Sequence, residues 1–177
     1  MTIAYSKKLL LHICCAICTS RVIEQLKSQF DTIGFFYNPN IEPVAEYQKR
    51  LDATMVLANY YNIPIIVGEY ENQLWHSHVN EYKNFPENSI RCEICFKLRM
   101  EKTATMCKIK NIENFTTTLA ASPHKNSTFI NQLGQKLATE YKINFILIPQ
   151  TQSYHSNIIR TLNLYRQKYC GCLFSLR

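Results

Sequence analysis

The chain has 177 residues, of which 46% are hydrophobic and 19% are charged, and its formal net charge is +7. These proportions exclude a largely disordered chain and are typical of one globular domain. The sequence offers no recognisable signal peptide and no run of the ~20 apolar residues that a membrane-spanning helix needs. We therefore expect a cytoplasmic protein without a membrane partner, whose positive charge suits a polyanion such as nucleic acid.

Strands and helices alternate along the first part of the chain. An almost continuously apolar run at residues 8–14 predicts a strand that is buried on both faces, and residues 19–30 have the apolar spacing of a helix. A second strand is expected at residues 32–38, a long helix at 43–61 and a third strand at 63–70.

The second part of the chain begins with a mostly helical excursion at residues 71–110, which carries the motif CEIC. Further strands are predicted at residues 113–122 and 143–149, with a helix near 128–141 between them and a last helix at about 156–169. This alternation predicts an α/β fold with a mainly parallel, Rossmann-like sheet.

Seven of the eight cysteines gather in three short motifs, CCAIC, CEIC and CGC. They are Cys14, Cys15, Cys18, Cys92, Cys95, Cys170 and Cys172. Disulfide bonds are not expected in a reducing compartment. A zinc site or an iron–sulfur cluster takes about four ligands, so seven clustered cysteines exceed one site and favour two neighbouring metal centres. We expect residues 1–177 to form a single α/β metalloenzyme domain.

The chemistry-bearing motifs follow predicted strands. Cys14 and Cys15 end the first strand, the turn at residues 37–40 follows the second, and the loop at residues 122–126 follows the fourth. Sites in open parallel sheets form beyond the carboxyl ends of the strands. We therefore expect these features to share one crevice.

Five motifs in this order resemble those of the QueH-type epoxyqueuosine reductases: LLLHICCAIC, FFYNPNIEPVAEYQKR, RCEICFKLRMEKTA, FTTTLAASPHKN and LYRQKYCGCLFS. The resemblance covers nearly the whole chain and implies the adenine nucleotide α-hydrolase (HUP) type of fold, without use of ATP. It also implies an enzyme that removes the epoxide oxygen of epoxyqueuosine at the wobble position of tRNAs with GUN anticodons. Two departures stand out: Ile17 stands where the family often has Pro, and Cys18 where some members carry a ligating Asp.

The same resemblance implies a [4Fe–4S] cluster and a separate mononuclear iron bound by the motif cysteines, and an electron-donor protein as a further partner. A cluster passes single electrons, and an iron with an open position acts as a Lewis acid, so the two centres would divide a reductive deoxygenation between them. The division of the seven cysteines between the two centres is left open.

Proton donors and RNA contacts are expected among residues near the motifs. His124 and Tyr37 are the candidate catalytic residues. Basic residues near the motifs are expected to contact anticodon-loop phosphates; they are Arg50, Arg91, Lys97, Arg99, Lys125, Arg160, Arg166 and Lys168. The foremost of these are Arg99, Lys125, Arg166 and Lys168.

Alternative functions remain open on the residues alone. The two Cys-x-x-Cys pairs could form one structural zinc site in an RNA-binding protein, and CEIC alone could be a redox dithiol. A tRNA thiolase or ATP pyrophosphatase of the same fold needs a Gly/Ser-rich phosphate loop after the first strand. The sequence there, HICCAICTS, has no glycine.

Overall fold

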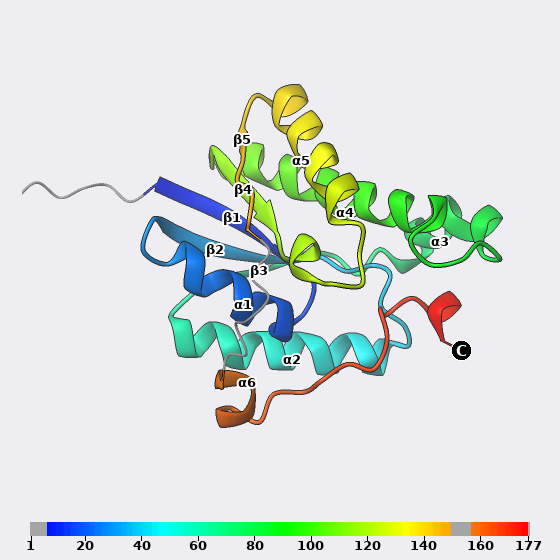
Figure 1. Cartoon of the computed structure of the whole chain (residues 1–177), viewed down its shortest axis with the longest axis horizontal. Coiled ribbons are helices and arrows are strands. Elements are labelled where there is room, and N and C mark those ends of the chain that lie inside the picture. Colours follow the sequence, from blue (N-terminus) through cyan, green and yellow to red (C-terminus); the bar gives the residue numbers. More distant parts are fainter. Residues whose placement is uncertain (1–6, 150–156, 177) are drawn as a thin grey trace, which may run out of the picture.

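The computed structural model of the chain describes residues 7–149 and 157–176. Figure 1 shows a central sheet with helices on both sides. The strands are β1 (Lys7–Ile13), β2 (Phe30–Phe36), β3 (Ile65–Val67), β4 (Asn114–Thr117) and β5 (Asn144–Phe145). All pairings between them are parallel, and the order in the sheet is β3-β2-β1-β4-β5.

Helices α1 and α2 cover one face of the sheet, and α4 and α5 cover the other (Figure 1). The helices are α1 (Ala16–Leu26), α2 (Val44–Tyr61), α3 (Asn72–Val79), α4 (Ile90–Ile109), α5 (Ser127–Tyr141) and α6 (Ile158–Thr161). The described residues also form three 3₁₀ turns: η1 (Asn80–Tyr82), η2 (Thr118–Ala121) and η3 (Leu173–Ser175). The α/β class with a parallel sheet is therefore confirmed, as is the helical insertion between β3 and β4.

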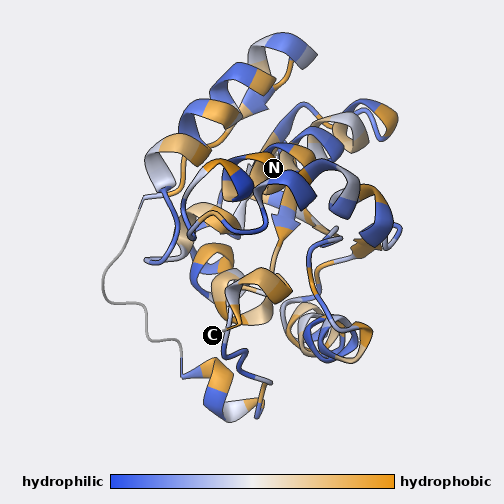
Figure 2. Cartoon of the chain, turned by 90° about the vertical axis from the view of Figure 1, so that its right-hand side faces the viewer, coloured by the Kyte–Doolittle hydropathy of each residue, from blue (hydrophilic) through white to orange (hydrophobic). Residues whose placement is uncertain are grey.

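The apolar run of β1 is explained by its central place in the sheet. Leu9 and Leu11 pack with α1 in one buried cluster, whereas Leu10 packs with residues of α4 and α5 in another. Successive side chains of a strand point to opposite faces, so a strand covered on both faces needs apolar residues throughout. The helix ribbons in Figure 2 are banded in hydrophilic and hydrophobic colours, because each helix buries only one side.

Several predicted boundaries are wrong. The helix expected at 19–30 begins at Ala16, because Cys15 caps it by accepting a hydrogen bond from the Cys18 amide, and it ends at Leu26. The strand expected at 143–149 has only two strand residues. The helix expected at 156–169 is reduced to α6; Asn163, with φ 49°, takes the left-handed conformation that ends a helix. Residue 156 itself lies outside the described residues.

The segment after α6 returns along α2 toward the end of the molecule where α3 lies (Figure 1). It is irregular from Leu164 to Cys172 and carries the CGC motif. In the described parts of the chain, no helix has the length and apolar character that a membrane span requires.

Candidate metal centre

A cavity of about 490 Å³ opens beyond the carboxyl end of β1. Its walls include cysteines from all three motifs, namely Cys14, Cys15, Cys18, Cys92 and Cys170. Of the described residues that line it, five are lysines or arginines and one, Glu87, is acidic. The cavity is therefore thiol-rich and cationic, and its size lies in the usual range for a small-ligand site.

The first set of cysteines is the N-terminal triad, Cys14, Cys15 and Cys18. Their sulfur atoms all lie within 4.8 Å of one another, and all three residues are buried. Cys14 directly follows β1, Cys15 is the N-cap of α1, and Cys18 lies in the first turn of that helix. The turn from strand to helix thus brings three potential metal ligands together.

Neighbouring groups donate hydrogen bonds to these sulfur atoms. The Thr118 hydroxyl donates to Cys14 Sγ at 3.1 Å, and it also accepts from the Cys14 amide at 3.0 Å. Gln167 Nε2 donates to Cys15 Sγ at 2.9 Å, as does the Cys18 amide at 3.4 Å. Donors of this kind orient ligating thiolates and tune a bound metal.

The triad favours one thiolate. Hydrogen bonding with Cys15 and Cys18 holds the pKa of Cys14 well below its ordinary value, against the effect of burial. The contact with Cys14 raises the pKa of Cys15 to about 11, and the contacts with Cys14 and Cys15 raise the pKa of Cys18 well above its ordinary value. A metal ion that binds all three sulfur atoms would displace their protons.

The second cysteine group consists of Cys92, Cys95, Cys170 and Cys172. Cys95 and Cys172 are buried against Trp75 and Val79, with Cys170 packed beside them. Burial raises the pKa of Cys92 and Cys95, and the nearby charge of Cys170 raises both further. These thiols are therefore close enough to interact, although α4 supplies two of them and the chain after α6 supplies the others.

Two cationic side chains lie near cysteines of both groups, Arg99 buried and Lys125 half-buried. Arg99 is 2% exposed and donates a hydrogen bond to the Asn38 side chain. Although burial opposes it, the negative charges of Cys14 and Cys170 raise the pKa of Lys125. Because Lys125 responds to cysteines of both groups, the two groups share one electrostatic environment.

The donor set fits an iron–sulfur or iron centre. Trp75 Nε1 and Arg99 Nε are buried and have no hydrogen-bond partner among the described residues. Burial raises the pKa of Cys95, whereas the Trp75 and Arg99 side chains act to lower it. Both side chains therefore lie beside the Cys95 sulfur. The sulfur atoms of such a centre accept hydrogen bonds. Thiolate ligands with unpaired N–H groups beside them therefore suit it.

The predicted catalytic residues differ in position. His124 is exposed and lines the cavity, and its carbonyl accepts a hydrogen bond from Asn88 Nδ2 at 3.1 Å. The Tyr37 hydroxyl instead donates to Glu71 Oε2 at 2.7 Å, and Tyr37 is not among the residues that line the cavity. A catalytic role for either residue stays a prediction.

The basic residues that were predicted to contact RNA also lie in different places. Arg166 and Lys168 are exposed, and Lys168 lines the cavity, whereas Arg99 and Lys125 lie at the cysteines. Arg91 is 2% exposed, and its Nη1 donates to two backbone carbonyls, those of Lys83 and Phe85. Buried and internally bonded, Arg91 is not placed to meet a phosphate, so that expectation is wrong.

Sequence reasoning missed the residues that support the cysteines. Thr118 and Gln167 bond to sulfur, and Trp75 packs on the second group. Arg50, expected at phosphates, is buried and bonded to the chain around Cys170. Of these supporting contacts, only the Glu46–Arg50 ion pair could have been predicted from the sequence. The two residues are four positions apart on a predicted helix, and such pairs form ion pairs.

Comparisons with known proteins show the family of the chain. The family described as epoxyqueuosine reductase QueH matches residues 9–177. A protein of that name from Thermotoga maritima is 37% identical over 174 residues, which are 94% of this chain and 89% of the relative. Another, from Acinetobacter baylyi, is 36% identical over 183 residues, covering 96% of this chain and 81% of the relative.

A solved structure supports the fold alone. It is titled as a predicted subunit of tRNA methyltransferase from Methanocaldococcus jannaschii. It matches 88% of this chain and 73% of its own with a TM-score of 0.56, at 11% sequence identity. The parallel α/β architecture is thus shared with a protein of very different sequence.

Proposed function

Since the chain belongs to the epoxyqueuosine reductase QueH family, we propose that it is a single-domain metalloenzyme that reduces epoxyqueuosine to queuosine at the wobble position of tRNAs with GUN anticodons. The observation that carries the proposal is the convergence of three cysteine motifs on one cationic cavity. Removal of the epoxide oxygen consumes two electrons and two protons and releases water. An electron-donor protein would supply the electrons.

We propose that the N-terminal triad holds one metal centre and the second cysteine group holds the other. The close approach of the triad sulfurs and the burial of the triad, Cys95 and Cys172 support this division. When bound, a [4Fe–4S] cluster and a mononuclear iron supply single electrons and a Lewis acid. Arg99 and Lys125 offset the negative charge of the thiolates, so several can be ionised in one buried region.

The basic wall of the cavity would bind the RNA backbone. Arg21 and Lys168 line the cavity, and Arg166 is exposed nearby in sequence. Cationic side chains near an opening hold phosphates while single bases are turned out of their stack. A volume of about 490 Å³ suits one modified nucleoside rather than a paired helix.

His124 is our candidate for a proton donor to the departing oxygen. It lies on the loop after η2 and lines the cavity with Cys14, Cys18 and Lys125. Its hydrogen-bonded backbone fixes the loop while its side chain is exposed. Tyr37 is less suited to this role because its hydroxyl is already bonded to Glu71.

The test is anaerobic reconstitution with iron and sulfide, incubation of the loaded protein with a chemical one-electron reductant and tRNA that carries epoxyqueuosine, and mass spectrometry of the nucleosides. We expect epoxyqueuosine to be converted to queuosine, and we expect Cys170→Ser and Cys172→Ser to abolish conversion. A structural zinc protein would instead hold one zinc without sulfide and tolerate both changes. Unchanged epoxyqueuosine with fully loaded protein would refute the proposal.

A further inference from the structure

We propose that Arg50, supported by Glu46, is a positioning residue that fixes the C-terminal segment (residues 165–172) so that Cys170 and Cys172 face the other cysteines. The inference rests on the proposed function only in treating these cysteines as metal ligands. No helix or strand holds the segment, since it is irregular between α6 and η3. Something else must define where its two cysteines lie.

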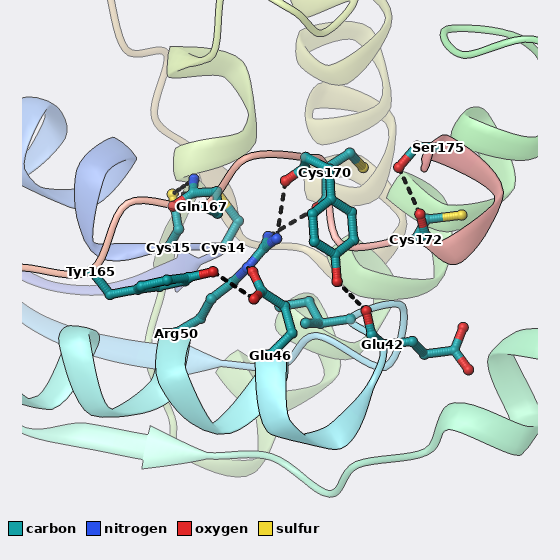
Figure 3. A network of polar contacts seen from close by, with 12 residues as sticks. Cys14, Cys15, Glu42, Glu46, Arg50, Tyr165, Gln167, Cys170, Cys172 and Ser175 are labelled. Carbon is teal, nitrogen blue, oxygen red and sulfur yellow. Dashed lines mark hydrogen bonds and ion pairs between the residues drawn. The ribbon is translucent and has the colours of Figure 1, made fainter. Parts of the chain in front are cut away.

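The Arg50 guanidinium bonds to the segment directly (Figure 3). Arg50 lies on α2 and is 3% exposed. Its Nη1 donates to the Cys170 carbonyl at 3.0 Å and its Nη2 to the Tyr169 carbonyl at 2.9 Å. Two donors of one rigid, planar group thus fix two consecutive carbonyls, which sets both the position and the direction of the chain.

Glu46 completes the anchor one turn earlier on the same helix. Its Oε1 accepts from Arg50 Nε at 2.7 Å, and its Oε2 accepts from the Tyr165 hydroxyl at 2.6 Å. The carboxylate therefore neutralises the buried guanidinium and also holds the start of the segment. A buried charge left without its partner is costly, so the pair acts as a unit.

Contacts just before α2 extend the anchor to the far end of the segment. The Glu42 amide donates to the Gly171 carbonyl at 2.8 Å, and the Tyr169 hydroxyl donates to the Glu42 carbonyl. The Arg50 guanidinium also lies over the Tyr169 ring, 5.2 Å from its centroid. The segment is therefore held at Tyr165, Tyr169, Cys170 and Gly171 by α2 or the residues leading into it, in addition to the bond from Gln167 to Cys15 Sγ.

The glycine between the two cysteines permits this approach. Gly171 has φ +114°, which residues with a side chain rarely adopt. A Cβ atom there would lie 2.9 Å from Ile41 Cγ1 and 3.1 Å from Arg50 Nη1. The spacing Cys-Gly-Cys therefore follows from how closely the segment passes Arg50.

Thiol labelling of the full chain tests the proposal. Anaerobically reconstituted protein is treated with a chelator and iodoacetamide, and the alkylation rate of each cysteine is read by peptide mass spectrometry. In Arg50→Lys we expect Cys170 and Cys172 to react about tenfold faster or more, because charged hydrogen bonds to two carbonyls are lost. Glu46→Gln should act in the same direction, and its iron content should fall without loss of helical circular dichroism.

Internal controls separate positioning from general unfolding. Cys107 is buried on α4 outside both cysteine groups and should stay unreactive, and Cys92 and Cys95 should change far less than Cys170. Glu140→Gln removes the same charge as Glu46→Gln, at an exposed position on α5, and should leave every rate unchanged. Unchanged rates at Cys170 and Cys172 in both variants, or an equal rise at Cys107, would overturn the proposal.

The labelling result does not depend on tRNA or on turnover. If wild-type protein failed to convert epoxyqueuosine, the proposed function would fall while the positioning role could still be observed. If the variants labelled like wild type while wild type converted epoxyqueuosine, only the positioning role would fall.

Discussion

The N-terminal triad and the C-terminal segment offer the same chemical group, a cysteine thiol, but they are held in different ways. The triad sits where β1 passes into α1, so the sheet and the helix fix its backbone. Cys170 and Cys172 lie on irregular chain whose place is set by side chains of α2. Cysteines can thus be prearranged either by regular structure or by a buried ion pair, and we expect the second arrangement to be the more vulnerable to single substitutions.

The largest effect should come from removing one ligand in each region. We expect Cys14→Ser and Cys170→Ser each to lower turnover by more than about 100-fold, since each removes a thiolate from a site with few ligands to spare. Iron and sulfide analysis beside the nucleoside assay would check this. Normal turnover in Cys170→Ser would contradict the expectation that both regions are needed, because only the triad would then be functional.

Gly171→Ala should come next and should affect only the side-chain-anchored region. The added Cβ meets Ile41 and Arg50, and the backbone angle becomes unfavourable, at a cost of roughly 1–3 kcal/mol. We expect lower iron content and faster alkylation of Cys172. Denaturant unfolding gives the energetic cost, and an unchanged triad labelling rate would serve as the control.

Thr118→Val tests the region held by regular structure. It removes a donor from Cys14 Sγ and leaves the Cys14 amide without its acceptor, so the free energy of unfolding should fall by about 1–3 kcal/mol. Iron affinity at the triad should fall by roughly tenfold. Thr105→Val, at an exposed position on α4, is the matched control and should change stability by less than about 0.5 kcal/mol.

Cys107→Ala asks whether a cysteine outside both regions matters. Its thiol is buried on the α4 and α5 side of the sheet, where burial is the cause of its raised pKa. We expect a loss of about 1 kcal/mol in stability from the missing sulfur, with metal content and turnover unchanged. Loss of iron from this variant would show that the division into two regions omits a ligand.

The smallest effect should come from Glu71, which lies in neither cysteine region. Hydrogen bonds from Lys102 and Tyr37 lower the pKa of this carboxyl, so its contribution to stability is present above its ordinary pKa and is lost as the pH falls below that value. Because both partners are partly exposed, Glu71→Gln should cost less than about 1 kcal/mol at pH 7. Unfolding curves at pH 7 and pH 3.5 should show this difference shrinking; a constant difference would contradict it.

The sheet and the cysteine motifs could be predicted because their signals are local. The apolar run at β1 requires burial on both faces, and the carboxyl ends of parallel strands meet at one edge. The last helix was overpredicted because apolar residues at helical spacing, such as Ile158, Leu162 and Tyr165, pack in one cluster although the helix ends at Thr161. Tertiary contacts decided the outcome there.

The support around the cysteines could not be predicted for a related reason. Arg50 binds carbonyls that lie 119 and 120 residues away, and a backbone carbonyl is the same in every residue. The choice of acceptor therefore leaves no mark in the sequence. Thr118 and Gln167 likewise act through sulfur atoms distant in the chain, so their roles emerge only once the fold is known.

The anchoring of Cys170 by Arg50 also sets an order of events during synthesis. Domains fold as the chain emerges, beginning with the part made first. The triad and α2 appear early, whereas residues 165–172 appear only after more than a hundred further residues. Until then Arg50 and Glu46 have no segment to hold and stay hydrated. Cys170 and Cys172 therefore join Cys92 and Cys95 late, so loading of the metal centre that we propose there would follow translation of this segment rather than accompany it.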